Sequence, residues 1–190
     1  MGNSAMRAEV VSSESERLIL VNEQDEEIGQ LDKGACHDGE GVLHRAFSVF
    51  LFNDAGELLL QQRASGKRLW PMYWSNSCCS HPRVGESMEF ATGRRLQEEL
   101  GLAAELRYLF KFSYSAAFGE LGSERELCSV YIGRANGEAA VNVTEINATR
   151  WVSPEALDEE FRTAPETLTP WFAIEWRRIR EDYMDAVRAL

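Results

Sequence analysis

Three histidines and two glutamates are the residues of this chain best suited to hold a metal ion. His37, His44 and His81 are the only histidines among its 190 residues. Glu124 and Glu126 alternate along an expected strand, so both carboxylates lie on the same face of it. Three imidazoles and two carboxylates suit an octahedral divalent ion such as Mn²⁺ or Mg²⁺, or Zn²⁺ with expanded coordination. Taken singly, each histidine is more often a hydrogen-bonded structural residue, so this pattern alone defines only a candidate site.

A second motif covers residues 80–102, S-H-P-R-V-G-E-S-M-E-F-A-T-G-R-R-L-Q-E-E-L-G-L. It resembles the Nudix box, G-x5-E-x7-R-E-U-x-E-E-x-G-U with U aliphatic, except that Ser80 replaces the first glycine and Arg95 replaces a glutamate. A full box gathers carboxylates around Mg²⁺ so that water can attack a bound diphosphate. The inverted charge of Arg95 predicts fewer metal ions, weaker water activation and a guanidinium that contacts diphosphate oxygens. The matching residues are Glu86, Arg94, Leu96, Glu98, Glu99, Gly101 and Leu102.

Four further motifs make the resemblance more specific. From about Leu18 to Trp176 the chain resembles type I isopentenyl-diphosphate isomerases, enzymes of Nudix fold. The resemblance implies interconversion of isopentenyl diphosphate and dimethylallyl diphosphate, by antarafacial proton addition and removal, in isoprenoid biosynthesis. The motifs are K-x3-H-x6-H (33–44), R-A-S-G-K-R-L-W-P (63–71), W-S-N-S-C-C-S-H-P (74–82) and E-R-E-L-C (124–128).

The same resemblance implies two metal ions and a phosphate-binding patch. One divalent ion, Mn²⁺ or alternatively Mg²⁺ or Zn²⁺, is expected to be held by the three histidines with Glu124 and Glu126. Glu99 is expected to contact a second ion, Mg²⁺, through the substrate diphosphate. Trp171 is expected to form the aromatic wall of the hydrocarbon pocket, where its ring stabilises a carbocation. The cations expected to neutralise the phosphates are Lys33, Arg63, Lys67 and Arg95.

Catalysis by proton addition and removal needs an acid and a base on opposite sides of the alkene. The resemblance assigns Cys79 to one side and Glu126 to the other, with Tyr114 relaying or orienting a proton. If Trp74 to His81 is extended, Ser75, Ser77, Cys79 and His81 share one face, whereas Asn76, Cys78 and Ser80 share the other. Because His81 faces the metal, Cys79 is expected to face it too, and Cys78 to pack in the core.

Two other functions compete with this interpretation. The first is a Nudix diphosphohydrolase acting on a nucleoside or prenyl diphosphate, and Arg95 and Cys79 argue against it because neither helps water attack phosphorus. The second is an inactive metal-binding or scaffold domain, which would have lost clustered acid–base residues that this chain retains. For the box alone, the simplest alternative is an ordinary helix with a solvated charged face.

The elements expected to position these residues form an α+β domain with a mixed, mainly antiparallel sheet flanked by helices. Ser87 is the expected N-cap and Gly101 the C-terminal stop of the box helix, and Ser153-Pro154 begins another helix. A long amphipathic helix is expected from about Thr169 to Arg188, with Ile174 on its apolar stripe. Residues 18–190 are expected to form one domain and residues 1–17 a flexible segment that includes a probable cloning remnant before Met6. The expected strands are 18–21, 28–31, 46–52, 58–62, 106–114, 126–133 and 149–152.

Composition limits the partners. The net charge of −11 and the pI near 4.8 argue against nucleic acid and against stable membrane association, so the expected partner is the small substrate. No run of 18 apolar residues and no secretory signal are present, which predicts a cytoplasmic protein. Cys36, Cys78, Cys79 and Cys128 form no C-x-x-C pair and are expected to be thiols. Nothing in the composition decides the oligomeric state.

Overall fold

All strands that the structure describes belong to one sheet. The protein is represented by a computed structural model, which describes residues 7–190. The strands are β1 (Arg17–Val21), β2 (Glu27–Asp32), β3 (His44–Phe52), β4 (Leu58–Arg63), β5 (Trp74–Ser75), β6 (Cys78–Ser80), β7 (Leu106–Ala117), β8 (Ser123–Arg134) and β9 (Ile146–Val152). The helices are α1 (Lys33–Cys36), α2 (Met88–Leu100), α3 (Pro154–Thr163), the 3₁₀ turn η1 (Pro165–Thr167), α4 (Pro170–Arg178), the π turn η2 (Ile179–Tyr183) and α5 (Met184–Arg188).

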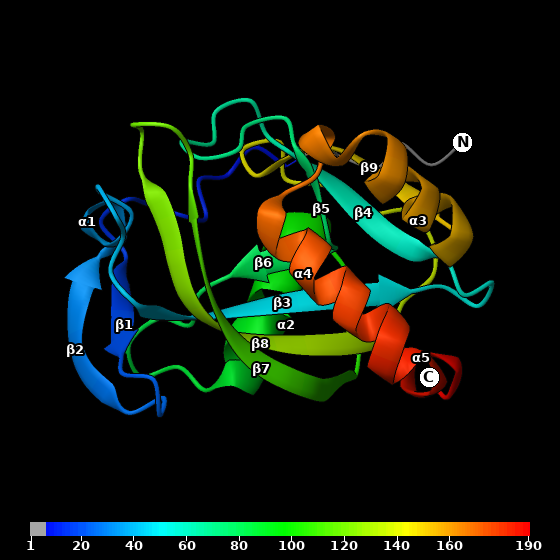
Figure 1. Cartoon of the computed structure of the whole chain (residues 1–190), viewed down its shortest axis with the longest axis horizontal. Helices are drawn as coiled ribbons and strands as arrows, with labels where there is room; N and C mark the ends of the chain where they lie inside the picture. Colours follow the sequence, from blue (N-terminus) through cyan, green and yellow to red (C-terminus); the bar gives the residue numbers. More distant parts are fainter. Residues whose placement is uncertain (1–6) are drawn as a thin grey trace.

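Strand β3 is the centre of the sheet (Figure 1). It pairs in parallel with β8 along its whole length and antiparallel with β1, β4 and β6. Strand β8 pairs antiparallel with β7, and β4 with β5 and β9. Among the strand pairs that the structure describes, only β3 and β8 run parallel, so the expected mixed, mainly antiparallel α+β fold is confirmed. The hairpin expected from β3 and β4 is reduced to one pair, Phe52 with Leu58, because β4 turns away toward β5 and β9.

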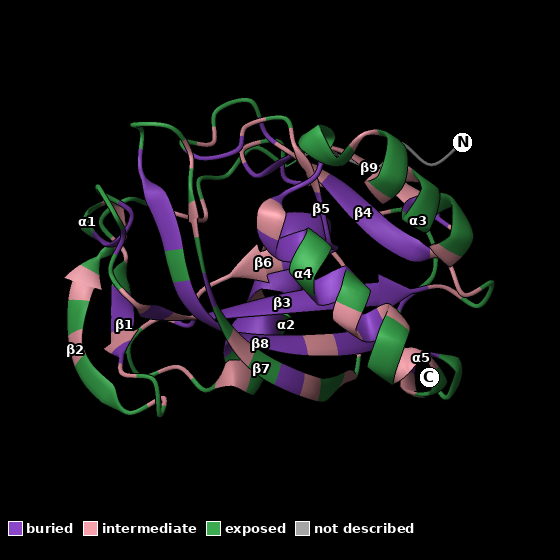
Figure 2. Ribbon diagram, in the orientation of Figure 1, coloured by how far each residue is buried: buried purple, intermediate pink, exposed green. Residues whose placement is uncertain are grey.

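Helices cover both faces of the sheet (Figure 1). Alternation along β3 sends Phe47, Val49 and Leu51 toward α2, into a core that also contains Leu96. The intervening residues, among them Phe50, point to the opposite face, which α4 and η2 cover. Figure 2 shows the resulting buried centre, with most exposed residues on helix surfaces, turns and outer strands. The strand period of two therefore assigns every residue of β3 to one helix layer or the other.

The local signals at the helix ends are confirmed. Ser87 caps α2 by accepting a hydrogen bond from the backbone N–H of Phe90, and Gly101 ends the helix in the left-handed conformation. Ser153 caps α3 in the same way, by accepting from the backbone N–H of Ala156, and Pro154 stands at the first helical position. The caps at Ser87 and Gly101 hold α2 in the register that the box residues need.

The expected C-terminal helix differs from the one observed. A π turn, η2, interrupts the α-helical hydrogen bonds between α4 and α5. Ile174, expected on the buried stripe, is exposed, and the buried side of α4 carries Phe172, Glu175 and Trp176 in its place. The buried side of the helix differs from the expected stripe because α4 begins at Pro170. The first turn of α4 packs Trp171 against the site and Phe172 against the core.

The N-terminal segment, expected to be flexible, contacts the domain at several points over residues 7–16. Arg7 forms a β-bridge with Asn142, and the backbone carbonyl of Glu9 accepts hydrogen bonds from Asn142 and Thr144. The Val11 carbonyl accepts from the guanidinium of Arg95. The probable cloning remnant lies outside the described residues.

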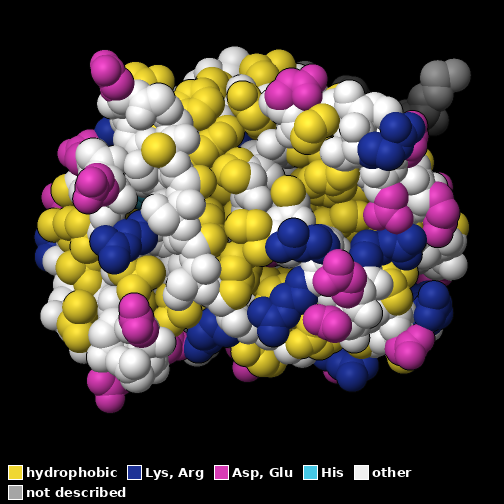
Figure 3. All heavy atoms as spheres, viewed as in Figure 1, with side chains coloured by type: hydrophobic (Ala, Val, Ile, Leu, Met, Phe, Trp, Pro, Cys, Tyr) yellow, Lys and Arg dark blue, Asp and Glu magenta, His cyan; other side chains and the backbone are white. Residues whose placement is uncertain are grey.

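The surface combines charges of both signs. Figure 3 shows acidic and basic side chains spread over one face, with apolar atoms between them. Within residues 7–190, no helix is both long enough and apolar enough to span a bilayer. On this face the acidic side chains are dispersed among basic ones, so a local basic patch is compatible with the acidic excess of the chain.

Candidate active site

A row of three side chains crosses the sheet at Glu126. In the β3–β8 pairing Glu126 lies opposite His44, and in the β7–β8 pairing it lies opposite Tyr114. The Tyr114 hydroxyl donates a 2.6 Å hydrogen bond to Oε2 of Glu126, while Oε1 faces His81 at 2.9 Å and His44 at 3.7 Å. One carboxylate thus joins the tyrosine on one side to the histidines on the other.

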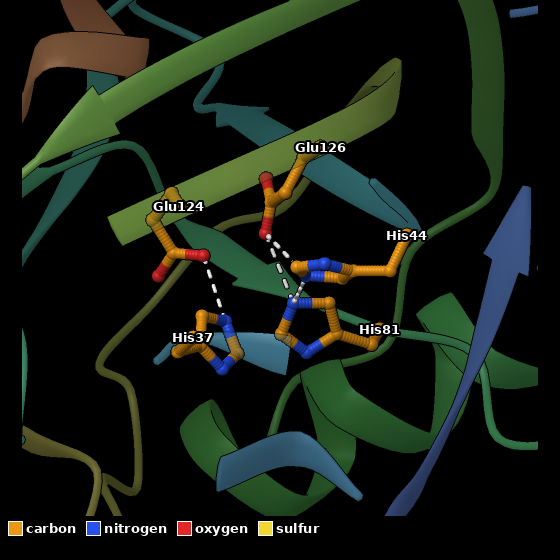
Figure 4. A group of neighbouring side chains, drawn as sticks. All are labelled: His37, His44, His81, Glu124 and Glu126. Carbon is orange, nitrogen blue, oxygen red and sulfur yellow. Dashed lines mark hydrogen bonds and ion pairs between the residues drawn. The ribbon is translucent and has the colours of Figure 1, made fainter. Parts of the chain in front are cut away.

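The five expected metal ligands form one cluster (Figure 4). His37 ends α1, His44 begins β3, His81 follows β6, and both glutamates project from β8. The ligand atoms, one per residue, all lie within 4.8 Å of one another. Nε2 of His37 lies 2.8 Å from Oε2 of Glu124, and the Nε2 atoms of His44 and His81 are 3.1 Å apart. The ligand set expected from the sequence is therefore assembled by the fold.

The hydrogen bonds around this cluster fit a cation at its centre. Nδ1 of His37 donates to the Lys33 carbonyl and Nδ1 of His44 to the Val42 carbonyl, each at 2.7 Å, which leaves both Nε2 lone pairs directed inward. The lone pair of His37 faces Oε2 of Glu124 at 2.8 Å and that of His44 faces Nε2 of His81 at 3.1 Å, and two acceptor atoms this close repel unless a proton or a cation lies between them. His37 Nε2 and Glu124 Oε2 are buried and lack a well-aligned hydrogen bond. The cluster is therefore suited to a divalent metal ion.

Burial and the neighbouring charges set the protonation of this row. Burial alone would raise the pKa of Glu126, but the neighbouring imidazoles of His44 and His81 outweigh it and hold the pKa well below its usual range. Burial raises the pKa of Tyr114 well above its usual range, and the charge of Glu126 adds to that effect. Burial lowers the pKa of His81 to about 4, against the opposing hydrogen bond to Glu126. Tyr114 is therefore a fixed donor to the Glu126 carboxylate.

The two adjacent cysteines lie on opposite faces of β6, as predicted. Cys79 pairs with Ser48 and packs beside Trp171, whereas Cys78 is fully buried in the core beneath α2. The alternation predicted through Trp74–His81 is wrong at Asn76 and Ser77, because the chain bends between β5 and β6. There Oδ1 of Asn76 turns back and accepts a 2.7 Å hydrogen bond from the Cys79 thiol.

The Cys79 thiol lies in a pocket of weak donors. It accepts from the indole N–H of Trp171 at 3.2 Å and from the Ser48 hydroxyl at 3.7 Å. Burial raises the pKa of Cys79 to about 12, and the charge of Glu175 contributes in the same direction. The Trp171 ring also meets Trp70 edge-on and faces the Arg63 guanidinium at 5.4 Å. The expected aromatic wall is therefore in contact with the expected catalytic thiol.

All four expected phosphate-binding residues line the same cavity. Lys33, Arg63, Lys67 and Arg95 line it together with Cys79, Glu126 and Trp171. Lys33 donates to the Ser12 hydroxyl at 2.5 Å, and Lys67 forms an ion pair with Glu145. Burial lowers the pKa of Lys67, against the opposing charge of Glu145. An incoming anion can replace these internal partners.

Arg95 and Glu99 have contacts that the sequence motif did not predict. The Arg95 guanidinium is buried between Glu99, at 2.5 Å, and Glu145, at 3.2 Å, and it also donates to the Val11 carbonyl. Glu99 lies behind it and does not line the cavity. A diphosphate or a Mg²⁺ ion at this position must therefore compete with a buried ion pair.

Sequence reasoning did not identify five residues of the site region. Arg68, Ser12 and Glu14 line the cavity, and Glu145 neutralises Lys67 and Arg95. Arg68 lies inside a quoted motif, and Glu145 has no local signal because its loop is brought in from beyond β8. Glu175 is buried beside the thiol. Its burial was predictable from the sequence, because it lies four residues after Trp171 and four before Ile179 on the same helical stripe.

The sheet, the capped helix α2 and the glutamates of the box define a class of protein, the Nudix domains. The NUDIX domain family model matches residues 42–172. A solved structure from Deinococcus radiodurans superimposes with a TM-score of 0.71 at 29% identity, covering 86% of this chain and 98% of that one. A MutT protein from Methanosarcina mazei shares the fold, with a TM-score of 0.61 at 20% identity over 74% and 96% of the two chains.

The relatives specify the family within this class. The chain is 45% identical over 157 residues to an isopentenyl-diphosphate Delta-isomerase of Burkholderia multivorans, covering 83% of this chain and 89% of the relative. It is 39% identical over 172 residues to isopentenyl-diphosphate Delta-isomerase 1 of Photorhabdus laumondii, covering 90% and 98%. The chain belongs to the isopentenyl-diphosphate Delta-isomerase family.

Proposed function

We propose that this protein is an enzyme that interconverts isopentenyl diphosphate and dimethylallyl diphosphate, moving the double bond by one proton addition and one proton removal. The observation that carries the proposal is a single cavity lined by two acid–base groups, Cys79 and Glu126, and by a cluster of cations. The family supports the same reaction, because its members are named for it. In a cell this activity supplies isoprenoid biosynthesis, and the four thiols fit a reducing cytoplasm.

Different residues of the chain bind the diphosphate and the hydrocarbon part of the substrate. Lys33, Arg63 and Lys67 hold the diphosphate, exchanging their internal partners for phosphate oxygens. Trp171 presents its ring to the hydrocarbon, where a π face stabilises developing positive charge. This anchoring fixes the alkene between the two acid–base groups and excludes water.

The protons move at two atoms. One of the two groups, the Cys79 thiol or the Glu126 carboxyl, is protonated and gives its proton to C4 of the alkene. The other is deprotonated and takes a proton from C2, so the substrate gains and loses one proton. Tyr114 holds Oε2 of Glu126 and relays or orients its proton. We assign Mn²⁺, with Mg²⁺ or Zn²⁺ as alternatives, to the histidine–glutamate cluster and Mg²⁺ to the diphosphate near Glu99; these ions supply charge that orients Glu126 and neutralises the phosphates.

The runner-up function is a Nudix diphosphohydrolase, and one contact disfavours it. A buried guanidinium, that of Arg95, lies among Glu98, Glu99 and Glu145. Hydrolysis needs several metal ions among such carboxylates to activate water. The arginine already neutralises them, so water attack at phosphorus lacks its activating ions. A direct role of Arg95 in binding diphosphate stays a prediction.

One assay separates the two functions. Purified protein is incubated with isopentenyl diphosphate and Mg²⁺, with and without Mn²⁺, and dimethylallyl diphosphate and released phosphate are measured separately. The proposal requires the isomer without phosphate release. Phosphate release without isomer would establish a hydrolase, and the absence of both products would contradict the proposed function.

A further inference from the structure

A buried carboxyl group on α4 takes no part in binding or proton transfer as described above. Glu175 is completely buried, on the side of α4 that faces β3 and β8. Its Oε1 accepts from the Cys128 thiol at 3.6 Å, and its Oε2 has no hydrogen-bond partner among the described residues. A buried carboxyl with one oxygen unsatisfied costs stability, so this residue needs an explanation other than packing.

The surroundings connect Glu175 to the thiol of the site. The Ser48 hydroxyl lies within hydrogen-bonding reach of Glu175, accepts from Cys128 at 3.5 Å and donates to Cys79 at 3.7 Å. The titratable or charged groups that face Glu175 are Cys79 from β6 and Cys128 and Glu126 from β8. None of them is a cation. The environment therefore favours a neutral carboxyl.

Because the Ser48 hydroxyl lies between the Glu175 carboxyl and the Cys79 thiol, we propose that Glu175 is a positioning residue for Cys79, acting through the Ser48 hydroxyl. The inference rests on the proposed isomerase function. A neutral Glu175, protonated at the oxygen that lacks a partner, can donate to Ser48 Oγ, so the single hydrogen of Ser48 is directed to Cys79 Sγ. An ionised Glu175 attracts that hydrogen instead and places a negative charge beside the sulfur. The state of Glu175 thus decides whether Ser48 adds its hydrogen bond to that of the Ser75 hydroxyl, which also lies 3.7 Å from the Cys79 sulfur.

The switch between these states lies near physiological pH. Burial raises the pKa of Glu175 to about 8, although hydrogen bonds from Ser48 and Cys128 oppose it. Below that pH the carboxyl is neutral and Ser48 supports the thiol. Above it the carboxylate withdraws that support, and kcat is expected to fall. KM depends on the diphosphate contacts and is expected to change little.

The test compares three replacements at this position and its neighbour. Glu175→Gln keeps a neutral donor of the same shape, and Glu175→Met removes it. Ser48→Ala removes the intermediary, and Glu181→Gln makes the same chemical change at an exposed position of η2 as a control. Kinetics of isopentenyl diphosphate isomerisation are measured from pH 6 to 9.5, with thermal unfolding recorded at each pH to confirm the folded state.

Glu175→Gln should keep kcat within about 3-fold of the wild type at pH 7 and lose the fall of kcat above pH 8. Glu175→Met should lose about 3- to 10-fold in kcat at unchanged KM, the factor for one neutral hydrogen bond. The double variant Ser48→Ala/Glu175→Met should be no slower than Ser48→Ala alone, because both changes break the same connection.

Three results would overturn the role of Glu175: equal kcat for the glutamine and methionine variants, an unchanged pH profile in Glu175→Gln, or additive losses in the double variant. These outcomes are distinct from a failure of the proposed function. An inactive wild type would refute the isomerase itself, whereas an active wild type with any of these results would refute only the connection through Ser48.

Discussion

At the scale of single residues, neighbouring residues of a strand have different roles because successive side chains point to opposite faces of the sheet. Cys79 faces the cavity with Trp171, and Cys78 faces the core beneath α2. Both are thiols, so chemistry alone does not distinguish them. Their position in the β3–β6 register does, since Ser48 pairs with Cys79 and Val49 with Cys78.

Cys79→Ala should therefore lose at least about 10³-fold in isomerisation, roughly 4 kcal/mol of barrier, and Glu126→Gln the same. Cys78→Ala should cost about 1 kcal/mol of unfolding free energy and little turnover. Steady-state kinetics and urea unfolding measure the two effects, and deuterium uptake from heavy water reports proton transfer directly. Normal turnover by Cys79→Ala together with loss in Cys78→Ala would show that the active face is assigned wrongly.

Arg95 provides a second test at this scale. Arg95→Glu would bury a fourth carboxylate beside Glu98, Glu99 and Glu145, so the metal-free variant should lose about 3–5 kcal/mol of unfolding free energy. Mg²⁺ should restore part of that loss, whereas isomerisation should stay weak and phosphate release slow. Arg95→Met is the control, because it removes the cation without adding an anion. Wild-type stability of Arg95→Glu in EDTA would contradict the ion-pair role.

At the scale of elements, the turn between β7 and β8 supports the loop that carries His37. Ser123 N–H donates to the His37 carbonyl at 3.0 Å, and a Cβ on Gly122 would lie 2.2 Å from that same oxygen. Gly122 also has a backbone φ of +145°, which residues other than glycine rarely adopt. The close approach of two backbones fixes the position of the histidine.

Gly122→Ala should therefore destabilise the protein by about 2 kcal/mol or more and weaken metal binding by about 10- to 100-fold, because His37 must move. Gly119→Ala, in the same turn, is the matched control: its φ is +58° but its Cβ would meet nothing within 4 Å. That variant should lose about 1 kcal/mol and keep its metal affinity. Urea unfolding and metal titration give both quantities, and equal effects of the two variants would rule out the contact as the cause.

Helix α4 makes stability depend on pH. Burial raises the pKa of Glu175 from 4.5 to about 8, so folding favours its neutral form. Its contribution is fully present below pH 4.5 and is lost as pH rises toward 8, by at most about 1.4 kcal/mol per pH unit. Glu175→Gln removes this dependence, so its stability relative to the wild type should increase between pH 5 and 8. Urea unfolding at pH 5, 6.5 and 8 checks the trend; a constant difference would mean that Glu175 does not titrate there.

At the scale of the whole molecule, the metal cluster joins segments that are distant in the sequence. His37 follows α1, His81 follows β6 and Glu124 lies on β8, and nothing local brings them together. The parallel pairing of β3 with β8 is the connection, because it places His44 opposite Glu126. A metal ion at the cluster therefore binds to the folded chain and not to the unfolded chain.

Divalent metal should consequently stabilise the fold. Mn²⁺ at 100 times its dissociation constant should add about 2.7 kcal/mol to the free energy of unfolding. EDTA should remove that increment and the activity reversibly, and His81→Ala should lose both in a way that Mg²⁺ alone does not restore. Thermal unfolding with and without Mn²⁺ measures the effect, with Glu181→Gln as a surface control. An unchanged melting temperature of the wild type on adding Mn²⁺ would contradict the metal site.

Local chemistry made much of this protein predictable from its sequence. The caps of α2 and α3 are single residues that bond within their own turn, so Ser87, Gly101 and Ser153 were predictable in place. Residue type and spacing indicated the five-membered cluster, and alternation indicated which cysteine faces it. The family resemblance added the reaction and the roles of the cations.

Only the tertiary structure decided which groups form ion pairs and hydrogen bonds with the charged and polar residues of the site. Glu145 reaches Lys67 and Arg95 from a distant loop, and the Val11 carbonyl arrives from a segment expected to be flexible. The bend that turns Asn76 onto Cys79 depends on where β5 and β6 find their neighbours. Hydrogen bonds within one turn depend on a few adjacent residues, whereas burial and ion pairing depend on every segment that packs around a group, and only the folded chain defines those segments.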